Sequence, residues 1–147
     1  MKDKVLLLVE DDPKDEALTL RALKKNNVSN EVVVVRDGSA ALDYLFGKGI
    51  YEGRDPADLP TAVLLDLKLP KVSGLEVLKG IRNDRRTKVL PVVILTSSNE
   101  QRDLIEGYGL GANSYVRKPV EFTEFSHAVR DLGLYWLILN QPPPPVP

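Results

Sequence analysis

The 147-residue sequence contains no cysteine. A disulfide framework and a thiolate site are therefore both excluded, which fits a reducing compartment. The sequence also has no excess of basic charge, because 20 lysines and arginines are balanced by 21 aspartates and glutamates. Without a net positive field, nonspecific binding to nucleic acid is not expected.

Long apolar runs are missing as well. The first run, Val5–Val9, is far shorter than the hydrophobic region of a signal peptide, and no later run reaches the length of a membrane span. We therefore expect a cytoplasmic protein that has no membrane partner. A chain of this length fits one domain whose core needs no covalent or metal staple. The single histidine, His127, has polar neighbours and is predicted to lie on the surface.

Short β-branched, apolar runs alternate with segments of helical periodicity along the chain. The five runs predicted to be strands are residues 5–9, 31–35, 63–66, 91–95 and 113–116. Five helices are predicted to follow them, and the aperiodic residues 48–60 are predicted to form an exposed loop. This alternation favours an α/β fold: a doubly wound, five-stranded parallel sheet with helices on both faces.

The central stretch of this pattern is Val63–Pro70, V-L-L-D-L-K-L-P, in which Asp66 ends a run apolar enough to be buried on both faces. In open α/β sheets, ligands bind at the carboxyl ends of the strands. The polar residues that leave the other predicted strands should meet Asp66 at that rim. They are Glu10, Asp11, Thr96 and Lys118.

The chemistry of this set points to a metal and a phosphoryl group. Two carboxylates ~4 Å apart repel by about 4 kcal/mol at an effective dielectric near 20, so the acids need a compensating cation. Oxygen ligands without histidine or cysteine select a hard ion and suit Mg²⁺. A carboxylate nucleophile, Asp66, beside this ion, the hydroxyl of Thr96 and the ammonium of Lys118 can accept a phosphoryl group.

Four motifs in order resemble the receiver domains of two-component response regulators. They are L-L-V-E-D-D-P at 7–13, L-L-D-L-K-L-P-K-V-S-G at 64–74, I-L-T-S-S at 94–98 and G-A-N-S-Y-V-R-K-P at 111–119. The resemblance covers nearly the whole chain and implies the flavodoxin-like receiver fold with strand order 2-1-3-4-5. It also implies a non-enzymatic signalling protein that is phosphorylated by a sensor histidine kinase.

The resemblance assigns roles residue by residue. It makes Asp66 the phosphorylation site, gives Mg²⁺ the ligands Glu10, Asp11, Asp66 and the backbone carbonyl of Lys68, and makes Thr96, Tyr115 and Lys118 the switch residues. It further implies that Lys68 and Ser98 tune the lifetime of the acyl phosphate and that the Lys118–Pro119 bond is cis. Two features depart from the pattern: Glu10 stands where many members carry Asp, and Asp12 is an extra acid without an assigned role.

Other interpretations compete with this one. A haloacid-dehalogenase-like phosphatase uses a similar set of groups, but it requires a second Asp two residues after the nucleophile, where this chain has Lys68. A pseudo-receiver scaffold typically lacks the acids or the lysine. Thr96 could simply cap a helix, and Tyr115 could be ordinary packing.

The end of the chain raises the question of a partner. The segment Leu134-Tyr135-Trp136-Leu137-Ile138-Leu139 is apolar all round and would expose large side chains on a monomer. We expect it to be covered in a homodimer that uses the fifth strand, the last helix and this tail. Gly133 leaves two forms open, a continuous helix seam or an arm laid on the neighbouring subunit.

The same ending, together with the 48–60 loop, resembles the receivers that accompany bacterial phytochrome kinases. This resemblance implies a red-light-sensing kinase as the phosphodonor. We expect a receiver domain over residues 1–139, with its dimerising segment from about 121, and a proline-rich end over 140–147 that carries no further domain.

Overall fold

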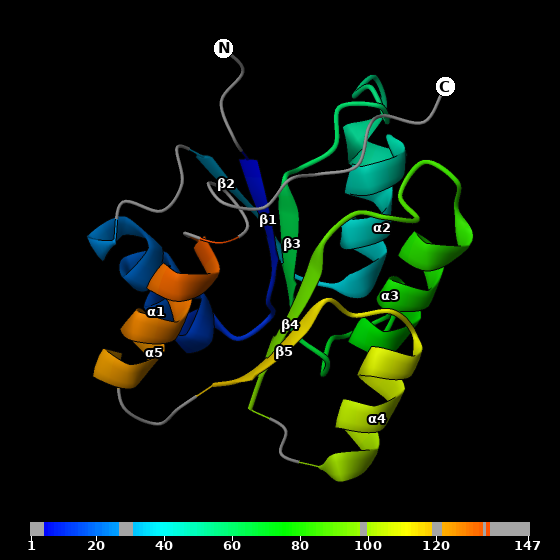
Figure 1. Cartoon of the computed structure of the whole chain (residues 1–147). Coiled ribbons are helices and arrows are strands. Elements are labelled where there is room, and N and C mark those ends of the chain that lie inside the picture. The colour runs from blue at the N-terminus through cyan, green and yellow to red at the C-terminus, as the bar shows by residue number, and fades with distance from the viewer. Residues whose placement is uncertain (1–4, 27–30, 98–99, 119–121, 134, 136–147) are drawn as a thin grey trace.

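The computed structural model describes residues 5–26, 31–97, 100–118, 122–133 and 135, except for the side chains of 132 and 133. Strands and helices alternate along these residues (Figure 1). The strands are β1 (Val5–Val9), β2 (Glu31–Val35), β3 (Ala62–Leu65), β4 (Val92–Thr96) and β5 (Ser114–Arg117). The helices are α1 (Pro13–Lys25), α2 (Gly38–Phe46), α3 (Gly74–Asn83), α4 (Gln101–Gly109) and α5 (Phe122–Gly133), with a short 3₁₀ helix, η1, at Gly49–Tyr51. Within the described part of the chain, every helix is too short or too polar to cross a membrane.

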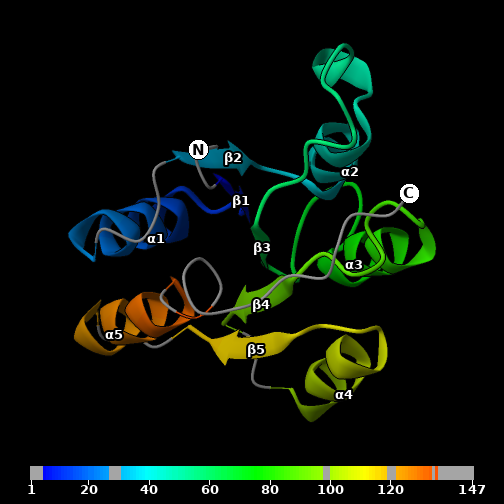
Figure 2. The same cartoon turned by 45° about the horizontal axis from the view of Figure 1, so that its top comes forward.

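The five strands form one parallel sheet in the order β2-β1-β3-β4-β5. Helices α1 and α5 cover one face, while α2, α3 and α4 cover the other (Figure 2). The predicted fold class, strand order and number of elements are therefore confirmed. The predicted strands at 91–95 and 113–116 are one residue early, since β4 begins at Val92 and β5 at Ser114, and the predicted strand at 63–66 is one residue late. Asn113 bonds to Val92 just before the β4–β5 ladder begins.

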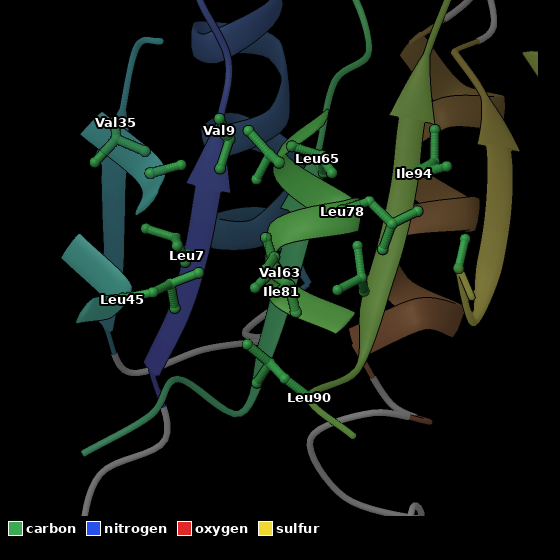
Figure 3. Packing of buried hydrophobic residues seen from close by; sticks show 14 of the residues in the cluster. Leu7, Val9, Val35, Leu45, Val63, Leu65, Leu78, Ile81, Leu90 and Ile94 are labelled. Atoms are coloured by element: carbon green, nitrogen blue, oxygen red, sulfur yellow. The ribbon is translucent and has the colours of Figure 1, made fainter. Parts of the chain in front are cut away.

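Alternating side chains of the central strands divide the core into two layers. In β1, Leu7 and Val9 point to the α2–α3 side, whereas Leu6 and Leu8 point to the α1–α5 side. Figure 3 shows the first layer, in which Leu78 and Ile81 of α3 pack against the sheet. Strands β3 and β4 are buried along their whole length, whereas the edge strands β2 and β5 are largely half-buried. This burial on both faces explains why the central strands read as continuous apolar runs.

The loop predicted at 48–60 is more firmly held than the sequence suggests. The guanidinium of Arg54 lies 4.0 Å from the centre of the Tyr44 ring and donates to the Tyr44 carbonyl at 2.8 Å. The ring of Tyr51 meets the same Tyr44 ring edge-on at 5.2 Å. The loop is therefore held against α2, although Ile50, in η1, is 89% exposed.

The tail lies mostly outside the described residues. Phe125 and Val129 of α5 are buried against the sheet, at the i, i+4 spacing of one helical face. His127 is exposed, as expected. The described part of the helix reaches Gly133, and the proposed interface residues Leu134, Trp136, Leu137, Ile138 and Leu139 fall outside the described set. The proline-rich residues 140–147 also fall outside it, so the predicted dimer surface and domain limits stay predictions.

Candidate functional site

The polar residues at the carboxyl ends of the strands meet at one rim of the sheet, as their positions predict. Backbone hydrogen bonds fix their relative placement. The amide of Asp66 donates to Val9 O at 3.1 Å, and the amide of Lys118 donates to Thr96 O at 2.7 Å. Strands β1, β3, β4 and β5 thus present Glu10, Asp66, Thr96 and Lys118 to a common region.

Asp66 is only 8% exposed and is held tightly by its own loop. Its Oδ1 accepts the amide hydrogen of Leu67 at 2.8 Å. The first turn of α3 presses against the same backbone, because a Cβ on Gly74 would lie 2.2 Å from Asp66 O and 2.6 Å from Leu67 Cα. Only glycine fits at position 74, and α3 consequently starts directly beside the acid.

Three acids form a cluster that could hold a cation. Glu10, Asp11 and Asp66 each offer a carboxylate oxygen, and these oxygens lie within 4.8 Å of one another. Glu10 is buried whereas Asp11 is exposed, so the cluster is open on one side. The pKa of Glu10 is raised from 4.5 to about 7, chiefly by burial; the contact with Lys118 lowers it and the nearby Asp66 adds to the rise. Ionised Glu10 needs a compensating positive charge, and the cluster offers carboxylate oxygens only. A hard divalent ion fits such a set of ligands.

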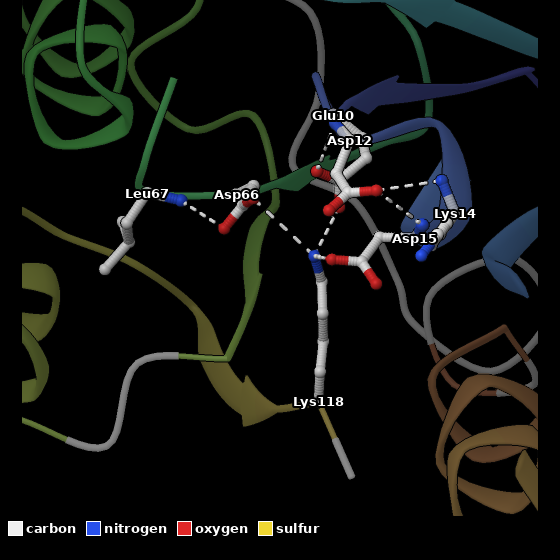
Figure 4. A network of polar contacts seen from close by, with 7 residues as sticks. All are labelled: Glu10, Asp12, Lys14, Asp15, Asp66, Leu67 and Lys118. Carbon is white, nitrogen blue, oxygen red and sulfur yellow. Dashed lines mark hydrogen bonds and ion pairs between the residues drawn. The ribbon is translucent and has the colours of Figure 1, made fainter. Parts of the chain in front are cut away.

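Lys118 brings a positive charge to the centre of the cluster. Its Nζ donates to Glu10 Oε1, lies 3.0 Å from Asp15 Oδ2 and lies 3.6 Å from Asp66 Oδ2 (Figure 4). Burial lowers the pKa of this amine, but the carboxylates of Glu10, Asp66 and Asp15 raise it by more, so the net pKa lies above the usual value. The ammonium is therefore charged and shared among three acids.

Two residues near the site have roles that the sequence-based prediction does not give. Asp12, the acid without an assigned role, is the N-cap of α1 and accepts the amides of Lys14 at 2.8 Å and Asp15 at 3.4 Å. The Asp12-Pro13 pair could have revealed this cap, since Asp is favoured at the N-cap and Pro at the first helical position. Asp15, in the first turn of α1, reaches Lys118, and its place in the sequence carries no comparable signal.

The remaining predicted residues lie on β4, on β5 and on the loop after Asp66. Thr96 is 1% exposed at the end of β4. Tyr115 is half-buried under α4, where its ring would lie 3.6 Å from a Cβ on Gly107. Lys68 is exposed on the loop after Asp66. Ser98 and Pro119 are outside the described residues.

Comparison with known proteins gives a consistent result. Residues 6–130 match the family described as the response regulator receiver domain. Among curated relatives, the probable methanogenesis regulatory protein FilR2 of Methanothrix harundinacea is 41% identical over 96% of this chain and 88% of its own length. Response regulator Rcp1 of Synechocystis is 38% identical over 91% of this chain and 89% of its own length.

Solved structures show the same relationship. The phosphorylated cyanobacterial phytochrome response regulator RcpA is 36% identical, with a TM-score of 0.88 over 97% of this chain and 100% of its own. The Mn²⁺-bound form of Rcp1 is 37% identical, with a TM-score of 0.86 over 96% of this chain and 99% of its own. The bacteriophytochrome response regulator RtBRR is 53% identical, with a TM-score of 0.79 over 97% of this chain and 86% of its own.

Proposed function

Since the chain belongs to the response regulator receiver family, we propose that its Asp66 accepts a phosphoryl group from a sensor histidine kinase. The observation that carries this proposal is the ammonium of Lys118, 3.6 Å from Asp66 Oδ2, beside an acid cluster whose oxygens lie within 4.8 Å of one another. Phosphoryl transfer needs mainly positioning and neutralisation of charge, and this arrangement offers both.

The chain's own groups divide the work. A carboxylate oxygen of Asp66 attacks phosphorus, the bond from phosphorus to the donor breaks, and an acyl phosphate forms. Lys118 pairs with the transferred oxygens, and the hydroxyl of Thr96 donates a hydrogen bond to one of them. Because Leu67 N–H already holds Asp66 Oδ1, the nucleophile is oriented before the donor arrives.

The metal that best fits the acids is Mg²⁺. Glu10, Asp11 and Asp66 would hold it, together with the backbone carbonyl of Lys68. When bound, the ion supplies positive charge that offsets the approach of two anions. Support comes from the oxygen-only donor set and from the Mn²⁺ form of the relative Rcp1.

The proposed phosphodonor is a bacterial phytochrome kinase. The support is the resemblance to RcpA and to RtBRR, which are both described as phytochrome response regulators. FilR2, a relative of comparable identity, is named for methanogenesis, so the kinase needs a direct test. Rates of phosphotransfer from a purified phytochrome kinase should exceed those from unrelated sensor kinases; equal rates would contradict the assignment.

The output is proposed to be a change of shape in a cytoplasmic, non-enzymatic signalling protein that does not bind nucleic acid. Phosphoryl oxygens draw the Thr96 side chain inward, and the ring of Tyr115, which lies under α4, moves into the space that Thr96 leaves. The functional unit is proposed to be a homodimer through β5, α5 and the apolar tail. Exposed apolar residues at Ile105 and Tyr108 of the neighbouring α4, and at Tyr135, support this surface. Sedimentation should show a dimer at micromolar concentration, and a monomer there would contradict it.

The phosphorylation site is tested with Asp66→Asn. This variant should fold but yield no acid-labile phosphate with Mg²⁺ and a small phosphodonor such as acetyl phosphate. The exposed aspartate of α5, changed in Asp131→Asn, is a control that should label like the unaltered protein. Labelling of Asp66→Asn at the normal level would refute the assignment.

A further inference from the structure

The Lys118 ammonium has one contact that the proposed transfer does not require. An ammonium has three hydrogens to donate, and here it faces three carboxylates. Two of them, Glu10 and Asp66, belong to the acid cluster already described. The third, Asp15, comes from α1 and lies 3.0 Å from Nζ, closer than Asp66 at 3.6 Å.

Asp15 is well placed to compete for this ammonium. Its own helix is fixed at the first turn by the Asp12 cap, and the positive end of a helix favours a negative charge there. The Lys118 side chain is 5% exposed and that of Asp15 is 33% exposed, so water screens the pair only on one side. The buried lysine can therefore shift its bonds among the surrounding acids, but it cannot leave them for solvent.

We propose that Asp15 is a positioning residue that holds the Lys118 ammonium toward α1 in the unphosphorylated protein and thereby weakens the hold of the site on a phosphoryl group. This inference rests on the proposed function of Asp66. A phosphoryl group on Asp66 would accept hydrogen bonds from the same Nζ, and it would therefore compete with Asp15 for the position of the ammonium. The site thus carries a built-in opposing contact, which biases the protein toward its resting form.

The test measures binding of beryllium trifluoride, a mimic of the acyl phosphate, in the presence of Mg²⁺. Asp15→Asn keeps a hydrogen-bond acceptor but removes the charge. It should bind the mimic at least roughly fivefold more tightly than the unaltered protein, which is the lower end of the usual coupling between two sites. Asp15→Ala should do the same. Asp15→Glu restores the charge and should return the affinity toward that of the unaltered protein.

A neighbouring acid provides the matched control. Glu16 lies in the same helical turn, but it pairs with Arg36 at 2.9 Å instead of with Lys118. Glu16→Gln changes the net charge by the same amount and should leave binding of the mimic unchanged. A gain equal to that of Asp15→Asn would show a general charge effect and overturn the proposal.

A spectroscopic measurement separates positioning from simple repulsion of the anion. The ¹⁵N resonance of the Lys118 ammonium, recorded without metal or mimic, should shift in Asp15→Asn and not in Glu16→Gln. Tighter binding with an unmoved resonance would mean that Asp15 acts directly on the anion, and unchanged binding would mean that it does not act at all; either result overturns the proposal. Failure of the unaltered protein to bind the mimic would instead count against the proposed function.

Discussion

Replacement of Glu10 by glutamine should stabilise the metal-free protein at pH 8. Glu10 is 1% exposed, and its burial raises its pKa from 4.5 to about 7. A carboxyl group with a raised pKa favours folding in its neutral form. Its contribution is therefore fully present below pH 4.5 and is lost as the pH rises through 7.

The size of the effect follows from the shift. A difference of about 2.5 pKa units corresponds to about 3 kcal/mol of cost once Glu10 is ionised in the folded protein, at 1.36 kcal/mol per unit. This cost already includes the favourable contact of the ionised carboxylate with Lys118, because that contact lowers the pKa from a still higher value. Glutamine avoids the cost, and Lys118 keeps Asp15 and Asp66 as partners, so Glu10→Gln should gain up to about 3 kcal/mol at pH 8.

Urea unfolding followed by far-UV circular dichroism, with EDTA present, measures this gain. At pH 5 most of the cost is absent from the unaltered protein, so the gain should fall below about 1 kcal/mol. The exposed acid of α4, changed in Glu106→Gln, should alter the free energy of unfolding by less than about 0.5 kcal/mol at both pH values. Millimolar Mg²⁺ should then stabilise the unaltered protein more than Glu10→Gln, since a ligand of the folded state adds stability by mass action.

A loss of stability in Glu10→Gln at pH 8, or a gain of equal size at both pH values, would refute this reasoning. The first result would mean that the bond with Lys118 outweighs the burial of the charge. The second would mean that the effect is independent of ionisation.

Three further changes test other parts of the structure. Thr19→Val should raise the urea-derived stability by about 1 kcal/mol, because the Thr19 hydroxyl is buried and has no hydrogen-bond partner among the described residues; a loss would reveal a partner. Gly74→Ala should lower the melting temperature and reduce the free energy of unfolding by more than about 2 kcal/mol, because its Cβ would lie 2.2 Å from Asp66 O. Gly109→Ala should reduce it far less, since a Cβ at that position has nothing within 4 Å. Asp12→Asn should keep the stability of the fold and, in calorimetric titration, its affinity for Mg²⁺. Asp12→Ala should lose about 1 kcal/mol of stability because the helix cap is missing. Weaker metal binding by Asp12→Asn would instead identify Asp12 as a metal ligand.

The sequence predicts the sheet and the rim well, for an identifiable reason. Strands buried on both faces must be continuously apolar, so a polar residue such as Asp66 or Glu10 at the end of such a run marks both the boundary of the strand and its functional edge. The positions of these polar residues in the sequence are therefore enough to predict that they meet at one rim of the sheet.

Other features depend on tertiary distances that the sequence does not encode locally. The contact between Asp15 and Lys118 joins residues 103 positions apart, and it exists only because α1 begins beside the end of β5. The raised pKa of Glu10 likewise depends on how deeply the fold buries its carboxyl group, which the sequence alone does not show. The contact between Arg54 of the 48–60 loop and Tyr44 could not be predicted either, because a single arginine among glycines and prolines is expected to be exposed to solvent.

The hydrogen bond from the Lys118 amide to the Thr96 carbonyl, at 2.7 Å, has a mechanical consequence. The Thr96 hydroxyl and the Lys118 ammonium are carried by backbones joined at that bond, so a displacement of one strand end would strain the other. Tyr115 lies in the same strand, three residues before Lys118, and shares this connection. A displacement of either side chain would therefore move the ends of β4 and β5 together. The NMR shift of the Lys118 amide proton would report this movement.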